Sequence, residues 1–332
     1  MEDTMQTITF GIIAYNEQQY LPDLLEDLLN QTYLKEKIEV IMVDGNSSDN
    51  TWKIMEKFKD DHEKEYHKIK LLHNNKRTQP AGWNMVIYNS TTDVILRIDA
   101  HARLPKNFIE KNILCLNSGE AICGGARENI IDENIPWKKI LLAAEQSMFG
   151  SGVATYRKRT NEKKYVKSIF HGAYRRNVFN NVGIFNENLI RTEDNELHYR
   201  IRKAGYRICY DPEIISYYQT RNSLPKMLKQ KYQNGLWIGK TLYVSPGCIS
   251  LFHLVPFLFI CAIIISSILC IFDFMWPTLL LWSAYGAVNF FMSVVATIKT
   301  ERKSYLCLML PLIFGLLHIC YGLGTMIGII KR

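Results

Sequence analysis

The last quarter of the sequence has very little charge. Residues 249–332 carry seven of the 72 charged side chains of the chain, and the first 248 residues carry the other 65. The two parts thus have the compositions of a membrane protein and of a soluble protein, which excludes a wholly soluble globular chain. With 48% hydrophobic residues overall, a disordered chain is excluded as well.

Paired cysteines and an N-terminal apolar run are also missing. The eight cysteines include no C-x-x-C pair, and four of them lie in the apolar tail. We therefore expect buried thiols rather than a disulfide framework or a zinc site. Residues 1–7 contain two acids and no apolar run, so we expect no signal peptide and a cytoplasmic location for residues 1–248.

The tail contains three stretches that reach the roughly 20 apolar residues needed to cross a bilayer. They cover about residues 249–272, 274–298 and 305–330. The connector 299–303 is basic, so the positive-inside rule places it in the cytoplasm and predicts a multi-pass plasma-membrane protein. An odd number of spans leaves Lys331 and Arg332 outside, a conflict that a re-entrant third segment would relieve. Gly324 and Gly328 in the third stretch indicate a helix-packing face rather than a dinucleotide loop.

Residues 1–222 alternate predicted strands with predicted helices. The strands cover about residues 7–14, 38–43, 69–72 and 94–98, and the helices about residues 17–31, 51–59 and 80–88. This alternation predicts an α/β fold with a mainly parallel sheet flanked by helices. Residues 223–248 are expected to form an amphipathic interfacial helix and a linker, followed by the α-helical membrane region 249–332.

Polar side chains follow three of the predicted strands. Tyr15 and Glu17 come after the first strand, Asp44 after the second, and Asp99 and His101 after the fourth. Ligands of open α/β sheets bind at the carboxyl ends of the strands, so these residues predict a site. Carboxylates alone would repel a phosphorylated ligand, and a divalent metal is therefore expected beside them.

Five motifs in this order resemble the family 2 inverting glycosyltransferases, which have the GT-A nucleotide-diphospho-sugar transferase fold. The resemblance covers about residues 5–240 and is greatest to succinoglycan-type exopolysaccharide enzymes. The motifs are residues 12–17 (IIAYNE), 43–51 (VDGNSSDNT), 97–101 (RIDAH), 172–185 (GAYRR followed by VGIF) and 193–197 (EDNEL).

The resemblance implies a role for each matching residue. Six residues would bind the donor: Ala14, Tyr15, Glu17, Asp44, Arg77 and Asp99. Asp44 would bind the nucleobase of the donor, and Asp99 would bind its ribose or its diphosphate. Arg77 can equally face solvent. His101, with Asp99, would hold Mn²⁺ or Mg²⁺. Asp194, beside Glu193, would be the general base, although helix capping or ion pairing with Arg191, Arg200 or Arg202 is the alternative. Gly172, Gln233 and Trp237 would lie on the acceptor side.

Two departures from the family pattern refine this expectation. His101 replaces the second aspartate of D-x-D, which favours Mn²⁺ over Mg²⁺. Residues 233–237 (QNGLW) lack the arginine of the processive Q-x-x-R-W motif. We therefore expect a membrane-bound, non-processive hexosyltransferase that uses a nucleotide sugar, namely a UDP-hexose, and a lipid-linked saccharide in exopolysaccharide or capsule synthesis. No nucleic-acid partner is expected. The alternatives are a processive polysaccharide synthase and a non-enzymatic membrane scaffold or transport component.

Overall fold

The computed structural model describes residues 6–131, 135–150, 159–220, 223–300 and 304–331. It divides into two compact units. The first comprises the chain up to residue 128 together with residues 155–219, and the second comprises residues 129–154 and 220–332. The basic connector 299–303 lies largely outside the described residues, as does Arg332.

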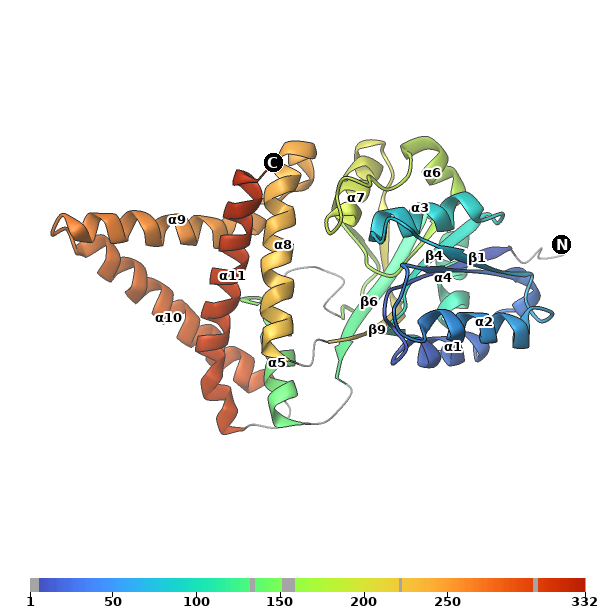
Figure 1. Cartoon of the computed structure of the whole chain (residues 1–332), viewed down its shortest axis with the longest axis horizontal. Helices are drawn as coiled ribbons and strands as arrows, with labels where there is room; N and C mark the ends of the chain where they lie inside the picture. Colours follow the sequence, from blue (N-terminus) through green and yellow to red (C-terminus); the bar gives the residue numbers. More distant parts are fainter. Residues whose placement is uncertain (1–5, 132–134, 151–158, 221–222, 301–303, 332) are drawn as a thin grey trace. The chain divides into compact units, whose positions relative to one another are not determined.

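The first unit is built on a mixed nine-stranded sheet (Figure 1). Its order is β3-β2-β1-β4-β8-β6-β9-β5, and β7 pairs with β9. The pairs β2–β3, β1–β2 and β1–β4 are parallel, whereas β4–β8, β6–β8, β5–β9 and β7–β9 are antiparallel. The strands are β1 Ile8–Ala14, β2 Ile38–Asp44, β3 Lys68–His73, β4 Val94–Asp99, β5 Ala102–Arg103, β6 Ile122–Ile130, β7 Lys164–Val166, β8 Gly172–Arg175 and β9 Ile208–Gln219.

Helices cover both faces of the sheet (Figure 1). On one face, α1 (Leu21–Leu29), α2 (Thr51–His62) and α4 (Phe108–Asn117) pack their apolar sides into one buried cluster with the strands. On the other face, α3 (Gln79–Asn89), α6 (Arg176–Val182) and α7 (Glu193–Lys203) form a second cluster. The strands β1, β2 and β4 are almost fully buried and mostly apolar because both of their faces are covered. The predicted α/β fold is confirmed.

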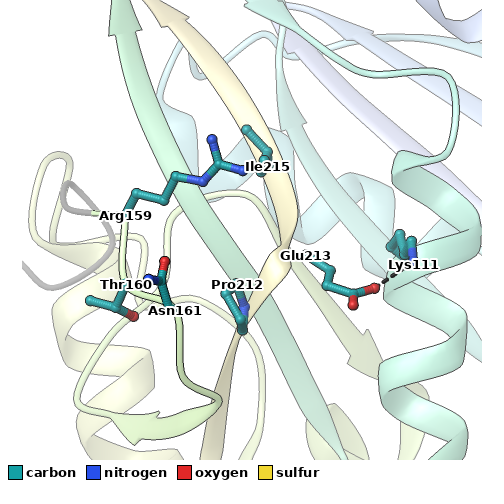
Figure 2. Close-up of a pocket in the computed structure, with 7 residues that line it drawn as sticks. All are labelled: Lys111, Arg159, Thr160, Asn161, Pro212, Glu213 and Ile215. Carbon is teal, nitrogen blue, oxygen red and sulfur yellow. Dashed lines mark hydrogen bonds and ion pairs between the residues drawn. The ribbon is translucent and has the colours of Figure 1, made fainter.

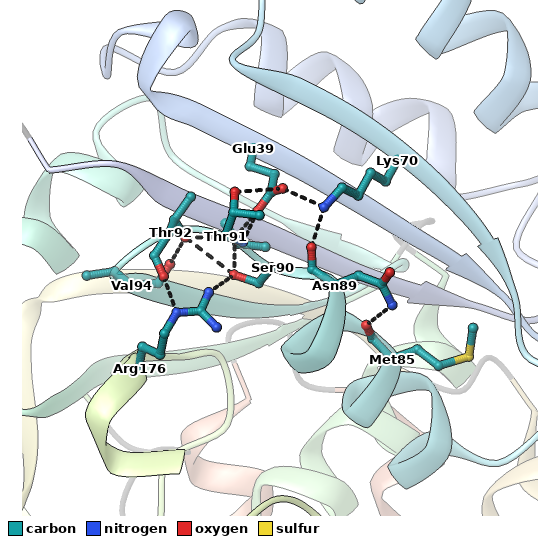
Figure 3. Close-up of polar contacts among 10 residues, drawn as sticks. Glu39, Lys70, Met85, Asn89, Ser90, Thr91, Thr92, Val94 and Arg176 are labelled. Atoms are coloured by element: carbon teal, nitrogen blue, oxygen red, sulfur yellow. Dashed lines mark hydrogen bonds and ion pairs between the residues drawn. The ribbon is translucent and has the colours of Figure 1, made fainter. Parts of the chain in front are cut away.

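A buried polar cluster closes the amino-terminal end of the parallel strands (Figure 3). The Glu39 carboxylate on β2 lies 3.0 Å from Lys70 Nζ and accepts hydrogen bonds from Thr9 Oγ1 and the Thr91 amide, each at 2.8 Å. Arg176 donates from Nε to the Thr92 carbonyl at 2.6 Å. These contacts tie the segment before β4 to β2 and α6 at the end of the strands opposite the predicted site.

The second unit is helical. It contains α5 (Pro136–Gln146), α8 (Leu224–Val244), α9 (Leu251–Ile271), α10 (Trp276–Lys299) and α11 (Leu310–Ile330). Three helical stretches are long and apolar enough to cross a membrane, at residues 251–271, 276–299 and 305–330. They coincide with the three predicted stretches. The first of the three contains Pro256, and the third begins with the short 3₁₀ helix Tyr305–Met309.

The helices α8 and α11 lie side by side along their length (Figure 1). Glycines allow this approach: a methyl group on Gly324 would lie 2.2 Å from the Tyr232 carbonyl oxygen, and one on Gly328 would lie 2.1 Å from that of Leu236. The predicted packing role of these two glycines is confirmed. The helix α8, expected at the membrane surface, uses much of its own surface to pack against α11, and its depth in a membrane stays a prediction.

Candidate active site

The parallel strands of the first unit bring the predicted donor residues to one edge. Ala14 at the end of β1 is in register with Asp44 at the end of β2, and Ile13 is in register with Asp99 at the end of β4. The three strands are adjacent in the sheet, in the order β2-β1-β4. The structure therefore places the ends of three separate motifs next to one another, as the alternating pattern predicts.

The turns after β1 and β2 hold each other through hydrogen bonds. The Asn16 amide donates to Ser47 Oγ and the Ser48 amide donates to Asn16 Oδ1, both at 2.8 Å. Asn16 has a φ of 55°, a left-handed conformation that asparagine tolerates better than most residues. The Glu17 amide donates to Thr51 Oγ1 at 2.8 Å. These hydrogen bonds fix the two turns, and Tyr15 between Ala14 and Asn16 is 56% exposed.

Asp44 is buried, and its surroundings contain two residues that the sequence analysis missed. Its carboxylate accepts a hydrogen bond from the Ser47 amide at 3.1 Å, and its Oδ2 lies 3.6 Å from His73 Nδ1. The His73 ring stacks on Trp52 with a centroid separation of 3.7 Å. An aromatic surface next to a buried acceptor is suited to a nucleobase.

His101 is held by the residue predicted to share its site. Its Nδ1 lies 2.9 Å from Glu17 Oε1, and its ring contacts the Tyr218 ring edge-on at 4.8 Å between centroids. Burial lowers the pKa of His101, but Tyr218, Glu17 and Asp99 outweigh this effect and raise the pKa to about 9. Its Nε2 is buried and has no hydrogen-bond partner among the residues that the structure describes.

Asp99 lies beside a second imidazole that the sequence analysis did not identify. Asp99 Oδ2 is 4.0 Å from His171 Nε2, and His171 Nδ1 is 2.8 Å from Ser216 Oγ. Burial lowers the pKa of His171 to about 3, with Asp99 acting in the opposite direction, so this imidazole is neutral. His171 precedes β8 and Ser216 lies in β9, strands that the hydrophobic pattern did not predict.

The pair of Asp99 and His101 fits a divalent cation as a partial ligand set. The His101 imidazole has a carboxylate on Nδ1 and an unpartnered Nε2, the arrangement of many metal-binding histidines. Among the described residues no group of three or more His, Cys, Asp or Glu side chains is placed to hold a metal. Phosphate and water oxygens would therefore have to complete the coordination, as is usual for metals bound with phosphorylated substrates.

Glu193 and Asp194 begin α7 and differ in their surroundings. Glu193 is 2% exposed and its Oε1 lies 3.4 Å from Arg97 Nη2, whereas Asp194 is only partly buried and accepts from the Asn195 amide at 2.7 Å. Burial and the charge of Asp194 raise the pKa of Glu193 to about 8. Burial also raises the pKa of Asp194 above its ordinary value, although Arg97 acts in the opposite direction. Glu193 is thus the fully buried member of the pair and carries a proton at neutral pH, and Asp194 is the less buried member.

The alternative role of Asp194 in ion pairing receives no support from Arg200. That guanidinium pairs with Glu196, with Nε 2.6 Å from Oε1, and Arg202 Nε donates to the His198 carbonyl at 3.2 Å. The first turn of α7 instead places Glu193 against Arg97 of β4.

The other predicted site residues occupy different environments. Arg77 is exposed, with a φ of 55°, in the turn after β3. Gly172 is buried in β8, where a methyl group would lie 2.4 Å from Ile169 Cδ1, so it is closely packed. Gln233 and Trp237 lie on α8 in the second unit, with Lys240 Nζ 4.9 Å from the centroid of the Trp237 ring. The roles assigned to these residues stay predictions.

A separate groove opens on the first unit between α4, β9 and residues 159–161 (Figure 2). It has a volume of about 440 Å³, and Lys111 and Glu213 form an ion pair across it. None of the predicted site residues lines it; the lining residues are Lys111, Arg159, Thr160, Asn161, Pro212, Glu213 and Ile215. We therefore do not assign the chemistry to this groove.

Comparison with known proteins decides the family. The model of "Glycosyl transferase family 2" matches residues 9–183, more than half of the 332-residue chain. The chain belongs to glycosyl transferase family 2. The match contains the strand ends described above, from Ala14 to His101, and ends ten residues before Glu193. The expected family, and with it the activity of a glycosyltransferase, is confirmed.

Two relatives are similar to this chain in sequence, and one solved structure is similar in fold. A Methanococcus voltae protein named dolichyl N-acetyl-alpha-D-glucosaminyl phosphate 3-beta-D-2,3-diacetamido-2,3-dideoxy-beta-D-glucuronosyltransferase is 28% identical, over 98% of both chains. The succinoglycan biosynthesis protein ExoA of Rhizobium meliloti is 26% identical, over 68% of this chain and 66% of its own. The mannosyltransferase PcManGT of Pyrobaculum calidifontis, solved with GDP-Man and Mn²⁺, superposes with a TM-score of 0.62 at 14% identity, covering 98% of this chain and 88% of that one.

Proposed function

We propose that this glycosyltransferase transfers one sugar, with inversion, from a UDP-hexose to a lipid-linked saccharide at a membrane. The observation that carries the proposal is that two sets of charged residues lie near the same end of the parallel strands. Glu17 and His101 follow β1 and β4, and their side chains are paired. Asp99 ends β4, and Arg97 of the same strand contacts Glu193 at the start of α7. One half supplies ligands for a nucleoside diphosphate and a cation, and the other half supplies a base.

The base in this proposal is Asp194. As the acceptor hydroxyl oxygen attacks the anomeric carbon, Asp194 takes the hydroxyl proton. The bond from that carbon to the diphosphate oxygen breaks in the same displacement, and the nucleoside diphosphate leaves with the bonding electron pair. Glu193, which carries a proton at neutral pH, holds the start of α7 in place through Arg97. A single displacement inverts the anomeric centre.

The donor side is built from the residues after β1, β2 and β4. Asp44, with His73 and Trp52 beside it, would receive the base, and Tyr15 would cover the nucleoside. Asp99 and His101 would hold Mn²⁺ or Mg²⁺, and that cation would neutralise charge on the departing diphosphate. His101 as a nitrogen ligand favours Mn²⁺.

Two observations support a membrane location and a lipid-linked acceptor. The second unit contains three helices long and apolar enough to cross a membrane. The Methanococcus voltae relative, which matches nearly the whole chain including these helices, is named for a dolichyl phosphate-linked acceptor. The processive Q-x-x-R-W motif is incomplete at residues 233–237, so we propose one transfer per encounter, in exopolysaccharide or capsule synthesis.

The proposal is tested by incubating membranes that contain the full-length protein with a panel of labelled UDP- and GDP-sugars and extracting the lipid fraction. We expect Mn²⁺-dependent label in lipid from one UDP-hexose, with a product one sugar longer than the acceptor. Asp194→Asn should lower the rate by about 10²–10⁴-fold, the usual contribution of a general base. An unchanged rate in that variant would remove the assigned base, and label from GDP-sugars alone would overturn the donor.

A further inference from the structure

Arg97 is a buried cation in β4, and the resemblance to the family assigns no role to it. The strand reads Val-Ile-Leu-Arg-Ile-Asp, and Arg97 is 5% exposed among apolar neighbours. A buried guanidinium is costly unless it is paired, so its presence requires compensating interactions. Alternate residues of a strand point to the same face, so Arg97 and Asp99 face the same side of the sheet, toward α3 and α7.

The contacts of Arg97 favour a role of its charge over a role of its hydrogen bonds. The guanidinium carbon lies 5.0 Å from the Trp83 ring centroid and 5.4 Å from that of Phe185, which fixes its plane. Its contact with Glu193, between Nη2 and Oε1, is long at 3.4 Å. Its Nε and Nη1 have no hydrogen-bond partner among the described residues.

Glu193 is the carboxylate in contact with this cation, and Asp194 follows it in the first turn of α7. Asp99 ends the same strand two residues after Arg97. Of the other ionisable groups in the surroundings, burial raises the pKa of Tyr174 and lowers that of His198 to about 3, so both are neutral. Arg97 is thus the positive charge in contact with the first turn of α7.

We propose that Arg97 is a positioning residue for the transfer step: its buried contact with Glu193 holds the first turn of α7, and with it Asp194, against β4. This inference rests on the proposed function. Trp83, Phe185 and Glu193 cover the guanidinium, so it does not contact the donor. Loss of Arg97 should therefore slow the chemical step and leave donor binding unchanged.

The test compares Arg97→Met and Arg97→Gln with Arg97→Lys in the full-length protein. We expect both neutral variants to lower kcat by about 100-fold or more, within the range attributed to a general base, while the Kd of UDP measured by calorimetry changes less than twofold. Arg97→Lys keeps the charge and should retain at least a tenth of the wild-type kcat. Either neutral variant, folded and with wild-type kcat, would overturn the proposal.

Arg176→Lys and Arg176→Gln are the matched controls, because Arg176 makes partly buried hydrogen bonds near the other end of β4, to Thr92 and Ser90. They are expected to lower thermal stability without separating kcat from UDP affinity. If neither neutral Arg97 variant folds, Arg97→Lys decides: a folded variant that loses as much kcat as Asp194→Asn contradicts the proposal. A wild-type protein without any transfer would refute the proposed function instead, which distinguishes the two failures.

Discussion

The imidazole of His101 lies 2.9 Å from the carboxylate of Glu17, which joins the turn after β1 to the end of β4. His101 Nε2 is buried and has no hydrogen-bond partner in the part of the chain that the structure describes, so it is the ring atom that we expect to bind a ligand. The residue after the first strand therefore orients the residue that replaces the second aspartate of the family motif.

Substitution of His101 should change the metal preference. His101→Asp restores an oxygen ligand and is expected to keep transfer while shifting the preference from Mn²⁺ toward Mg²⁺, because magnesium favours oxygen ligands. His101→Ala should lose most metal-dependent activity. The measurement is the transfer rate titrated with each metal. Wild-type metal dependence in His101→Ala would exclude this side chain as a ligand.

The two acids at the start of α7 should respond differently to loss of charge. Glu193 carries the proton of the pair at neutral pH, so Glu193→Gln is expected to retain kcat within about fivefold, well short of a general base's contribution. Asp194→Asn should lose about 10²–10⁴-fold. Rates at saturating donor, with UDP affinity as the control for folding, separate the two. The reverse order of effects would exchange the assigned roles.

The sequence predicts the part of the site on the parallel strands but not the part on the antiparallel strands. The ends of β1, β2 and β4 were predicted because apolar runs followed by polar turns define parallel strands. β8 and β9 were missed: β8 has four residues, and β9 contains Pro212 and mixed polarity. They carry Tyr218 and Ser216, and His171 directly precedes β8, so these neighbours of Asp99 and His101 were missed with them. Arg97 could have been identified from the sequence, because it is a charged residue within an otherwise apolar run, Val94–Ile98.

The buried pair of Glu39 and Lys70 should make stability depend on acid pH. Burial raises the pKa of Glu39, but hydrogen bonds from Thr91 and Lys70 outweigh it and lower the pKa. A lowered pKa stabilises the fold above the unfolded value, about 4.3, and this contribution is lost as pH falls through the folded value.

Glu39→Gln, which removes the charge, should therefore lower the free energy of unfolding by about 3 kcal/mol near pH 7. The difference from wild type should begin to narrow as pH falls below about 4.3, where the unfolded chain takes up the proton, and should vanish once pH has fallen through the lower pKa of the folded state. Glu56→Gln, at an exposed position on α2, is the matched control. A difference that stays constant down to pH 3 in thermal unfolding curves would contradict the assigned charge state.

The glycine contact between α8 and α11 gives a prediction for the second unit. Gly324→Leu forces a side chain against the Tyr232 carbonyl and should cost about 1–3 kcal/mol, the usual range for overpacking. Gly286→Leu on α10 is the control, since a methyl group there meets no atom within 4 Å. Thermal unfolding in detergent compares them, and equal effects of the two substitutions would argue against the α8–α11 pairing.

A crystal structure of the full-length protein with UDP and Mn²⁺, with the metal located by anomalous scattering, tests the central claim most directly. We expect one manganese peak bonded to Asp99, His101 and the diphosphate, the uracil beside Asp44, and the Asp194 carboxylate facing the same cavity. A manganese ion bound elsewhere, or Asp194 turned away from the diphosphate, would contradict the account.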